Sequence, residues 1–405
     1  MEPGSRPSGP ERPTVIISAA EVGRANRARI VQALADRGPL SRADLARITN
    51  VPRATIGSIV KSLLSSGWLE EGQPRPPADG IGKPGTPLWF GRHAGLSGAI
   101  HVQPRRVVTA VVNAAGDILS THRHKIPART STEGVVSVIL NAAAQEFHHD
   151  MDELTGIGLA LPAAVDRQTG EVMACTPLPA LVGSHLRQRL EDLTQVPTVV
   201  EEDVTTLALG QRWFGQARGV DDFAALQIGD GIGAAVMLGG HLLRSRVGLS
   251  EIGHTCVDLR GQKCTCGLIG CWETVASNNW LRHTARQLDI TTSPKLTPHR
   301  LVRLATSGDK AAQGLADMYA INVAVGIANL VQFLALPVLV LHGDIVGGGE
   351  YLRSRVEQAV IARTFPAHVS GRVGQLEIQL AHNDADACLL GAAASVLSRT
   401  LHIHV

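Results

Sequence analysis

The feature that most constrains this chain is a group of soft metal ligands between residues 254 and 271. Cys264, Cys266 and Cys271 follow His254 with the spacing Cys-x-Cys-x4-Cys. Three thiols and one imidazole make a closed tetrahedral donor set for Zn²⁺, which leaves no position for a reactive water. We therefore predict one structural zinc ion per chain that holds the loop 251–273 in a fixed shape. The alternatives are a redox dithiol or thiols buried for unrelated reasons.

The remaining cysteines do not fit this spacing. The chain has six cysteines, and Cys175, Cys256 and Cys388 lie outside the pattern. Because the N-terminus lacks the apolar core of an export signal, the clustered cysteines favour a metal over disulfides. We expect the other three to be small buried side chains without a chemical role.

Composition and charge limit the classes of protein that this chain can belong to. The 405 residues are 44% hydrophobic and 18% charged, which is enough for two or three domains with cores of their own. No stretch approaches the ~20 uninterrupted apolar residues of a membrane span, so we expect a cytoplasmic protein. Residues 1–90 carry 12 Lys and Arg against 8 Asp and Glu, whereas the rest carry 26 against 28. This small basic excess indicates nucleic acid as the partner of the front segment.

The front segment has the pattern of a DNA-binding domain. Its Pro, Gly, Ser and Arg content predicts a flexible leader over residues 1–20, followed by a winged helix-turn-helix over residues 21–90. The helical spacing of apolar residues predicts a first helix over residues 24–37, which the following Gly-Pro pair ends.

Two further helices and two strands complete this prediction. Ser41 and Asp44 have the spacing of a helix cap, which satisfies free backbone N–H groups at the start of a short second helix. The segments 68–70 and 88–90 flank a Gly/Pro loop as two wing strands. The third helix carries one apolar stripe, formed by Ile56, Ile59, Val60, Leu63 and Leu64.

The residues that this stripe leaves free are small or basic, as a DNA-reading helix requires. We expect Arg53, Thr55 and Ser58 near base edges. We expect Lys61 and Arg42 to contact phosphates, and Lys83, near the wing tip, to enter the minor groove. The alternative is an ordinary three-helix packing module in which these side chains are merely solvated.

Residues 91–405 alternate between strand and helix patterns. A hairpin is expected from residues 98–102 and 107–112. Further strands are expected at 154–161, 198–201, 224–228 and 337–341, with helices at 186–193, 205–213 and 320–334. This order predicts an α/β domain of two lobes with a cleft between them.

Several motifs together resemble those of one family. Glu251-Ile-Gly-His254 precedes Cys-x-Cys-Gly-x-x-Gly-Cys-x-Glu, and a Gly-Asp-Gly-Ile-Gly-Ala turn begins at Gly229. With the winged helix-turn-helix they resemble the ROK family of repressors and sugar kinases, over about residues 24–399. The resemblance implies that residues 91–405 form a ROK-type, actin-like ATPase fold of two α/β lobes that senses a sugar.

The resemblance also implies roles for single residues. Glu251, His254 and Glu273 match the family's sugar-hydroxyl ligands, and His254 also belongs to the matched zinc set. Carboxylates and an imidazole suit a polyhydroxyl ligand because they offer paired hydrogen bonds. Asp203 matches the general base of family kinases, and Glu202 stands at a sugar-contacting position that is usually Asn.

One hairpin departs from the kinase pattern. Where a family kinase has Asp-x-Gly-Gly-Thr, residues 100–106 read Ile-His-Val-Gln-Pro-Arg-Arg. His101 replaces the carboxylate that organises Mg²⁺, both phosphate-wrapping glycines are missing, and Pro104 removes a backbone donor. The late glycine-rich turn is also altered, to His-Gly-Asp-Ile at residues 342–345. We therefore expect no enzyme activity, with Asp203 as a vestigial base.

These observations predict a transcriptional regulator, a repressor of carbohydrate-metabolism genes. It would bind operator DNA as a homodimer or homotetramer and a sugar or sugar derivative in its rear domain. An active ATP-dependent sugar kinase with a fused DNA-binding module is the alternative. A third option is a regulator without sugar binding, because Glu202 and Pro177 depart from the family's sugar-contacting residues.

Overall fold

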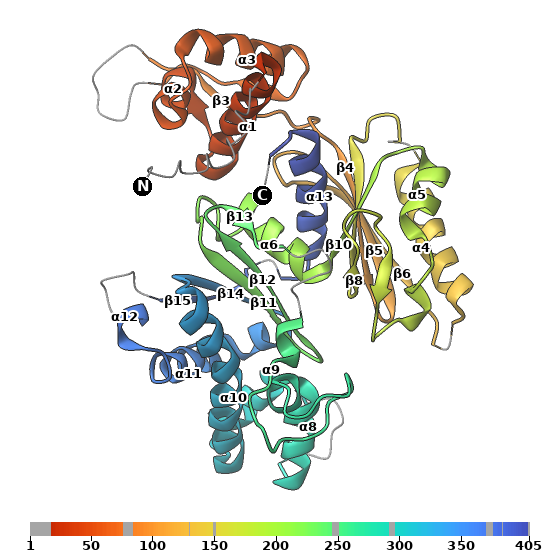
Figure 1. The fold of residues 1–405 in the computed structure, drawn as a ribbon, viewed down its shortest axis with the longest axis vertical. Coiled ribbons are helices and arrows are strands. Elements are labelled where there is room, and N and C mark those ends of the chain that lie inside the picture. The colour runs from red at the N-terminus through yellow and green to blue at the C-terminus, as the bar shows by residue number, and fades with distance from the viewer. Residues whose placement is uncertain are drawn as a thin grey trace, which may run out of the picture.

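The N-terminal domain consists of three helices and a small antiparallel sheet (Figure 1). In the computed structural model, α1 (Ala19–Arg37), α2 (Arg42–Thr49) and α3 (Arg53–Ser65) pack beside a sheet of order β1-β3-β2. The strands are β1 (Leu40–Ser41), β2 (Leu69–Glu71) and β3 (Pro87–Phe90). This arrangement confirms the predicted winged helix-turn-helix.

The structure describes residues 18–75, 84–128, 130–148, 151–244, 251–290, 296–369, 376–382 and 384–403. Most of the predicted leader therefore lies outside the described residues. α1 begins at Ala19 and not at residue 24, as the apolar pattern had indicated. The reason is a capping box, in which the Ser18 hydroxyl accepts from the Glu21 N–H at 3.2 Å and the Glu21 carboxylate accepts from the Ser18 N–H at 2.7 Å.

The first lobe is built on a five-stranded sheet of order β10-β7-β4-β5-β6. The predicted hairpin is confirmed as β4 and β5, which pair antiparallel and are buried along nearly their whole length. Near-continuous apolar strands need cover on both faces, and the helices provide it: α4 packs on one face and α13 on the other. The elements are β4 (Ser97–Gln103), β5 (Arg106–Val112), β6 (Ile118–Lys125), α4 (Thr132–Phe147), β7 (Gly156–Leu161), β8 (Ala164–Val165), β9 (Val172–Ala174), η1 (Pro179–Leu181), α5 (Leu186–Thr194), β10 (Thr198–Glu202) and α13 (Ala387–Thr400).

The second lobe is built on another five-stranded sheet, of order β13-β12-β11-β14-β15. Its core is dominated by the long helix α10, which begins at Lys310 and not at residue 320 because the Asp309 carboxylate caps it by accepting from the Ala312 N–H at 3.0 Å. The elements are β11 (Phe223–Ile228), β12 (Ile232–Leu238), β13 (His241–Leu242), η2 (Glu251–His254), α7 (Glu273–Ala276), α8 (Asn278–Gln287), α9 (Pro298–Thr306), α10 (Lys310–Leu334), β14 (Val338–His342), η3 (Asp344–Gly348), α11 (Gly349–Ile361), α12 (Pro366–Val369) and β15 (Glu377–Leu380).

One helix of the second lobe has the length and apolar character of a membrane span. This is α10, the one such helix in the described part of the chain. Of its most apolar window, 61% is buried inside the protein. Residues such as Leu315, Tyr319 and Val323 are fully buried against neighbouring elements, which is the behaviour of a core helix.

Two helices join the three parts of the molecule. α6 (Asp203–Trp213) and α13 pack closely on each other and lie between the two sheets and the N-terminal domain (Figure 1). The approach requires glycine at residue 391, since a Cβ there would lie 1.6 Å from the Thr206 carbonyl oxygen. Leu209 of α6 and Leu397 of α13 share one buried core with Ile30 of α1. The DNA-binding domain is therefore packed directly on the helices that link the lobes.

Candidate functional site

The four predicted metal ligands lie together. The donor atoms of His254, Cys264, Cys266 and Cys271 all fall within 4.8 Å of one another. The Sγ atoms of Cys266 and Cys271 are 3.7 Å apart, and His254 Nδ1 is 3.5 Å from Cys264 Sγ. A tetrahedral zinc ion with Zn–S bonds of about 2.3 Å holds its sulfur ligands about 3.8 Å apart. The donor set and spacing therefore fit a tetrahedral metal and do not fit a disulfide, whose sulfurs are about 2 Å apart.

The backbone of this loop folds in a way that aims the thiols inward. The Cys264 N–H donates to the Leu268 carbonyl at 2.8 Å, and the Gly267 N–H donates back to Cys264 at 3.0 Å. Gly270 has a positive φ of 72°, and a Cβ on it would lie 1.7 Å from the Asp258 carbonyl oxygen. No other residue type fits there, because any side chain would force the loop apart.

The other cysteines behave as predicted in two of three cases. Cys175 and Cys388 are buried, and burial raises the pKa of both thiols. The prediction for Cys256 is wrong, since its side chain is exposed. Its backbone forms a β-bridge with Cys271; Cys271 is buried, whereas Cys256 lies on the outer surface of the loop.

Three of the predicted sugar ligands lie in residues 251–273, here called the Cys/His loop. His254 uses Nδ1 toward the thiols, while its Nε2 lies 3.4 Å from the Glu251 carboxylate. Glu273 is the last residue of the loop and the first of α7, and its carboxylate accepts from the Ile232 N–H at 3.1 Å. One imidazole thus connects the metal set to an exposed carboxylate, so a bound metal would fix the position of these predicted sugar ligands.

Glu202 and Asp203 lie on the first lobe, where β10 ends and α6 begins. Asp203 is half-buried and accepts from the Val204 N–H at 2.7 Å. Burial raises the pKa of Asp203 to about 7, and the neighbouring Glu202 carboxylate adds to the rise. The five predicted sugar ligands therefore fall into two groups, one on each lobe, and a ligand held by both would fix the angle between the lobes.

One buried histidine lies in the altered hairpin, and a second belongs to a buried polar network elsewhere that the sequence did not reveal. His101 on β4 is buried, and burial, with a contribution from Arg106, lowers its pKa to about 4. The fully buried His342 on β14 hydrogen-bonds through Nδ1 to Asp384 at 2.8 Å and through Nε2 to Gln211 at 3.3 Å. These side chains link β14, α6 and the segment before α13.

The same network occupies a backbone donor of the late glycine turn. The Gly343 N–H donates to the Asp384 carboxylate, at 3.1 and 3.2 Å to its two oxygens. A nucleotide phosphate at this turn would have to compete with a carboxylate that belongs to the chain. Asp384 follows a strand of the second lobe by only a short segment, so a carboxylate near the end of a strand was the only signal that sequence offered.

The predicted DNA-contacting residues lie mainly on one face of α3. Arg53, Ser58 and Lys61 are exposed and Thr55 is half-buried, whereas Ile56, Val60 and Leu63 of the predicted stripe are buried. Arg42 differs from the others because its guanidinium is engaged by the Glu71 carboxylate on β2. Lys83 lies outside the described residues.

Comparisons with known proteins agree with this two-part organisation. The ROK family model matches residues 98–399, and a MarR family model matches residues 22–80. The xylose repressor of Bacillus subtilis (strain 168) is 25% identical over 351 residues, which cover 85% of this chain and 88% of the repressor. A glucokinase of Thermotoga maritima is 30% identical over 262 residues, which cover 62% of this chain and 81% of the kinase.

A solved structure extends the likeness to the whole fold. The crystal structure of a ROK family transcriptional regulator, a homolog of the E. coli MLC protein, aligns with a TM-score of 0.78 and 22% identity. The alignment covers 94% of this chain and 97% of that regulator. Because the ROK model matches most of the residues and the helix-turn-helix precedes it, this chain belongs to the ROK family, with a MarR-type DNA-binding domain ahead of the ROK domain.

Proposed function

We propose that this chain is a ROK-type transcriptional repressor of carbohydrate-metabolism genes, with a sugar or sugar derivative as its effector. One contrast carries the proposal. The proposed sugar ligands Glu251, His254 and Glu273 lie together on the Cys/His loop. By contrast, a buried His101 stands in the hairpin where family kinases hold phosphate, and the Asp384 carboxylate occupies the Gly343 N–H of the late glycine turn. A protein built this way binds a sugar and does not phosphorylate it.

In this proposal α3 is the main DNA-contacting helix. Arg53, Thr55 and Ser58 read base edges, Lys61 and Arg42 contact phosphates, and Lys83 enters the minor groove. Two copies of the domain in a homodimer, or in a homotetramer made of two dimers, read two half-sites of an operator. The relative named xylose repressor and the MarR-type domain support this assignment.

A structural zinc ion completes the proposed site. His254, Cys264, Cys266 and Cys271 would hold it with no open position, so its role is to fix the loop and not to activate water. The sugar then meets preset donors and acceptors, and less ordering entropy is lost on binding. We place the protein in the cytoplasm, where operator DNA and the sugar are both present.

Coupling between the sugar and DNA would pass through α6. Asp203 begins this helix, and Arg212 near its end pairs with Asp36 of α1 within the core that joins the domains. Arg218, shortly after α6, donates from Nε to the Ala35 carbonyl at 2.7 Å. A sugar that draws the lobes together shifts α6, and the shift in DNA affinity is limited by the sugar's preference for one lobe arrangement.

The second candidate is an ATP-dependent sugar kinase with a DNA-binding module. The relative named glucokinase supports it, as does Asp203, whose raised pKa of about 7 suits a general base. The hairpin and Asp384 count against it, since phosphoryl transfer depends on phosphate positioning that these residues disturb.

The test is calorimetric titration of the zinc-loaded protein with monosaccharides, their phosphates and ATP, with and without DNA from the region upstream of its gene. We expect one sugar or sugar derivative to bind, to change DNA affinity, and to need no ATP. Tight ATP binding accompanied by phosphorylation of a sugar would instead establish the kinase. Arg53→Ala should cost about 1–3 kcal/mol of preference for operator over random DNA, while Arg47→Ala on the exposed side of α2 should leave that preference unchanged.

A further inference from the structure

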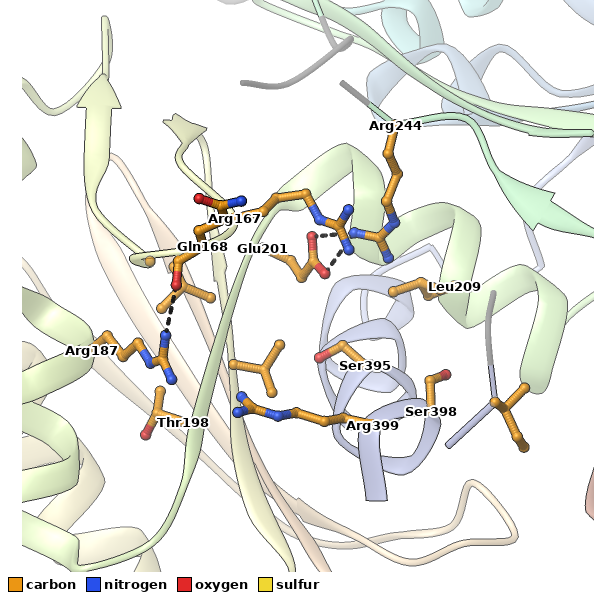
Figure 2. A pocket seen from close by; sticks show the side chains of 14 residues that line it. Arg167, Gln168, Arg187, Thr198, Glu201, Leu209, Arg244, Ser395, Ser398 and Arg399 are labelled. Carbon is orange, nitrogen blue, oxygen red and sulfur yellow. Dashed lines mark hydrogen bonds and ion pairs between the residues drawn. The ribbon is translucent and has the colours of Figure 1, made fainter. Parts of the chain in front are cut away.

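Four arginines line a cavity whose described lining contains none of the predicted metal or sugar ligands. Its volume is about 340 Å³, and it runs along the edge strand β10 beside the C-terminal end of α13. The arginines come from four separate parts of the chain, and Figure 2 shows how they surround the same hollow: Arg167 between β8 and β9, Arg187 on α5, Arg244 after β13, and Arg399 at the end of α13. Only tertiary folding brings these positions together.

Positive charge exceeds negative charge in this cavity. Glu201 is the single carboxylate among its described lining residues, and Arg244 already engages it with two hydrogen bonds of 2.8 and 3.0 Å. Arg187 is satisfied in part by Glu191, at 3.3 Å. Within the described part of the chain, the Arg399 side chain has no acceptor at hydrogen-bond distance.

One of these guanidinium groups is perturbed by its surroundings. Burial, together with the nearby charge of Arg244, lowers the pKa of Arg167. Arg187 and Arg244 are half-buried, while Arg167 and Arg399 are exposed at the rim. Like charges gathered in this way repel each other, and an anion that binds between them relieves the repulsion. The described lining also offers hydroxyl groups on Thr198, Ser395 and Ser398, and all three residues are buried.

We propose that this cavity binds a small phosphorylated ligand, a phosphomonoester such as a sugar phosphate, at a site distinct from the sugar-facing residues. Guanidinium groups match phosphate oxygens with paired hydrogen bonds, which favours phosphate over a neutral sugar. The volume lies within the range of small-molecule sites and is too small for a DNA duplex. The hydroxyl groups of Thr198, Ser395 and Ser398 would then hydrogen-bond the non-phosphate part of the ligand.

The position of the cavity gives the bound anion a regulatory consequence, which rests on the proposed function. Leu209 and Ile403 line the cavity and also belong to the core that packs against α1. Glu201 directly precedes Glu202 and Asp203, the sugar-facing pair of the first lobe. An anion that draws Arg399 toward β10 moves the end of α13, on which the DNA-binding domain rests.

The test uses the full-length zinc-loaded protein and two matched variants. Arg399→Gln removes a cavity arginine from the last turn of α13, and Arg286→Gln removes an arginine from the last turn of α8, outside the cavity. Both residues are exposed and both complement a helix C-terminus, so any cost to helix stability is alike. Calorimetric titrations with glucose 6-phosphate, inorganic phosphate, glucose and NaCl at matched ionic strength measure binding without reference to DNA.

We expect glucose 6-phosphate to bind wild type and Arg286→Gln equally, and Arg399→Gln at least about tenfold more weakly, as expected for the loss of one charged hydrogen bond. Arg187→Gln should weaken binding similarly. Equal affinity for inorganic phosphate would make free phosphate the ligand, and weaker phosphate binding would favour the phosphomonoester. The proposal is overturned if neither anion binds, if NaCl competes equally well, or if Arg399→Gln binds like Arg286→Gln. It is also overturned if Arg53→Ala, on the DNA-binding surface, abolishes the binding.

Whether the anion changes operator affinity is a separate measurement. If glucose 6-phosphate binds in an Arg399-dependent way and operator affinity does not change, the cavity is an anion site without a regulatory role. Loss of operator binding by the wild-type protein without any ligand would instead count against the proposed function, and not against the cavity.

Discussion

The Cys/His loop (residues 251–273) keeps the residues of its motif, whereas the hairpin of β4 and β5 has lost those of the phosphate motif. The loop keeps every donor of a tetrahedral metal site within 4.8 Å and aligns Glu251 and Glu273 beside it. The hairpin has the fold expected of it, yet His101 and Pro104 stand where phosphate-binding chemistry would be needed. The comparison teaches that the metal-ligand set and the phosphate motif depend on different turns of this fold, so that one can change while the other is kept.

The largest effect should come from breaking the loop. Cys271→Ser removes a buried donor, so we expect loss of stoichiometric zinc, a lower melting temperature and no sugar response. The fall in metal affinity should exceed the about 10- to 100-fold that is typical of outer-shell partners. The zinc content of each variant after dialysis against a weak chelator measures this fall in metal affinity. Cys256→Ser is the control, since Cys256 is exposed in the same loop, and zinc loss in this control would contradict the ligand assignment.

A smaller effect is expected from a change that leaves the metal in place. Glu251→Gln keeps the shape of the side chain and removes its charge, so sugar affinity should fall about 10- to 100-fold with zinc retained. Asp258→Asn changes an exposed carboxylate of the same loop that caps a local turn, and it should bind sugar as wild type does. Calorimetry on both variants compares them, and equal affinities would remove Glu251 from the ligand set.

The first-lobe carboxylate gives a pH-dependent effect. Since burial raises the folded-state pKa of Asp203 from 3.8 to about 7, the folded protein holds this proton more tightly than the unfolded chain. The resulting stability is complete below about pH 4 and is lost as the pH rises to about 7, by up to about 1.4 kcal/mol per pH unit. Asp203→Asn should remove this slope, whereas Asp152→Asn on the surface should retain it. Urea unfolding at pH 5 and pH 7.5 gives the free energy of unfolding of each variant at both pH values. If wild type and Asp203→Asn lose the same free energy of unfolding between these pH values, the pKa of Asp203 is not raised.

The smallest effect is expected at the hairpin, where we predict no gain. Replacing His101 by Asp and Pro104 by Gly restores two features of a phosphate-binding turn, but the Asp384 carboxylate still occupies the Gly343 N–H. Neither wild type nor the double variant should transfer phosphate from ATP to a sugar. A coupled assay for sugar phosphate measures this, with the glucokinase of Thermotoga maritima as the positive control. Product formation by the wild type would reverse the assignment of the hairpin.

Local sequence patterns determined much of the architecture. The spacing of His254 and the three cysteines predicted a metal set that the fold brings together, because these donors lie within one short loop. The apolar stripe of α3 placed Ile56, Val60 and Leu63 inside and Arg53 outside. Both patterns lie within short stretches of sequence, so they can be read without knowing which distant residues pack against them.

Tertiary structure alone decided the rest. The His342–Asp384–Gln211 network joins residues from three elements, and the four arginines of the cavity come from four segments that only the fold brings together. The exposure of Cys256 also depended on which side of the loop faces the protein. Charge and burial at such positions depend on neighbours that are distant in sequence, and a one-dimensional pattern carries no record of them.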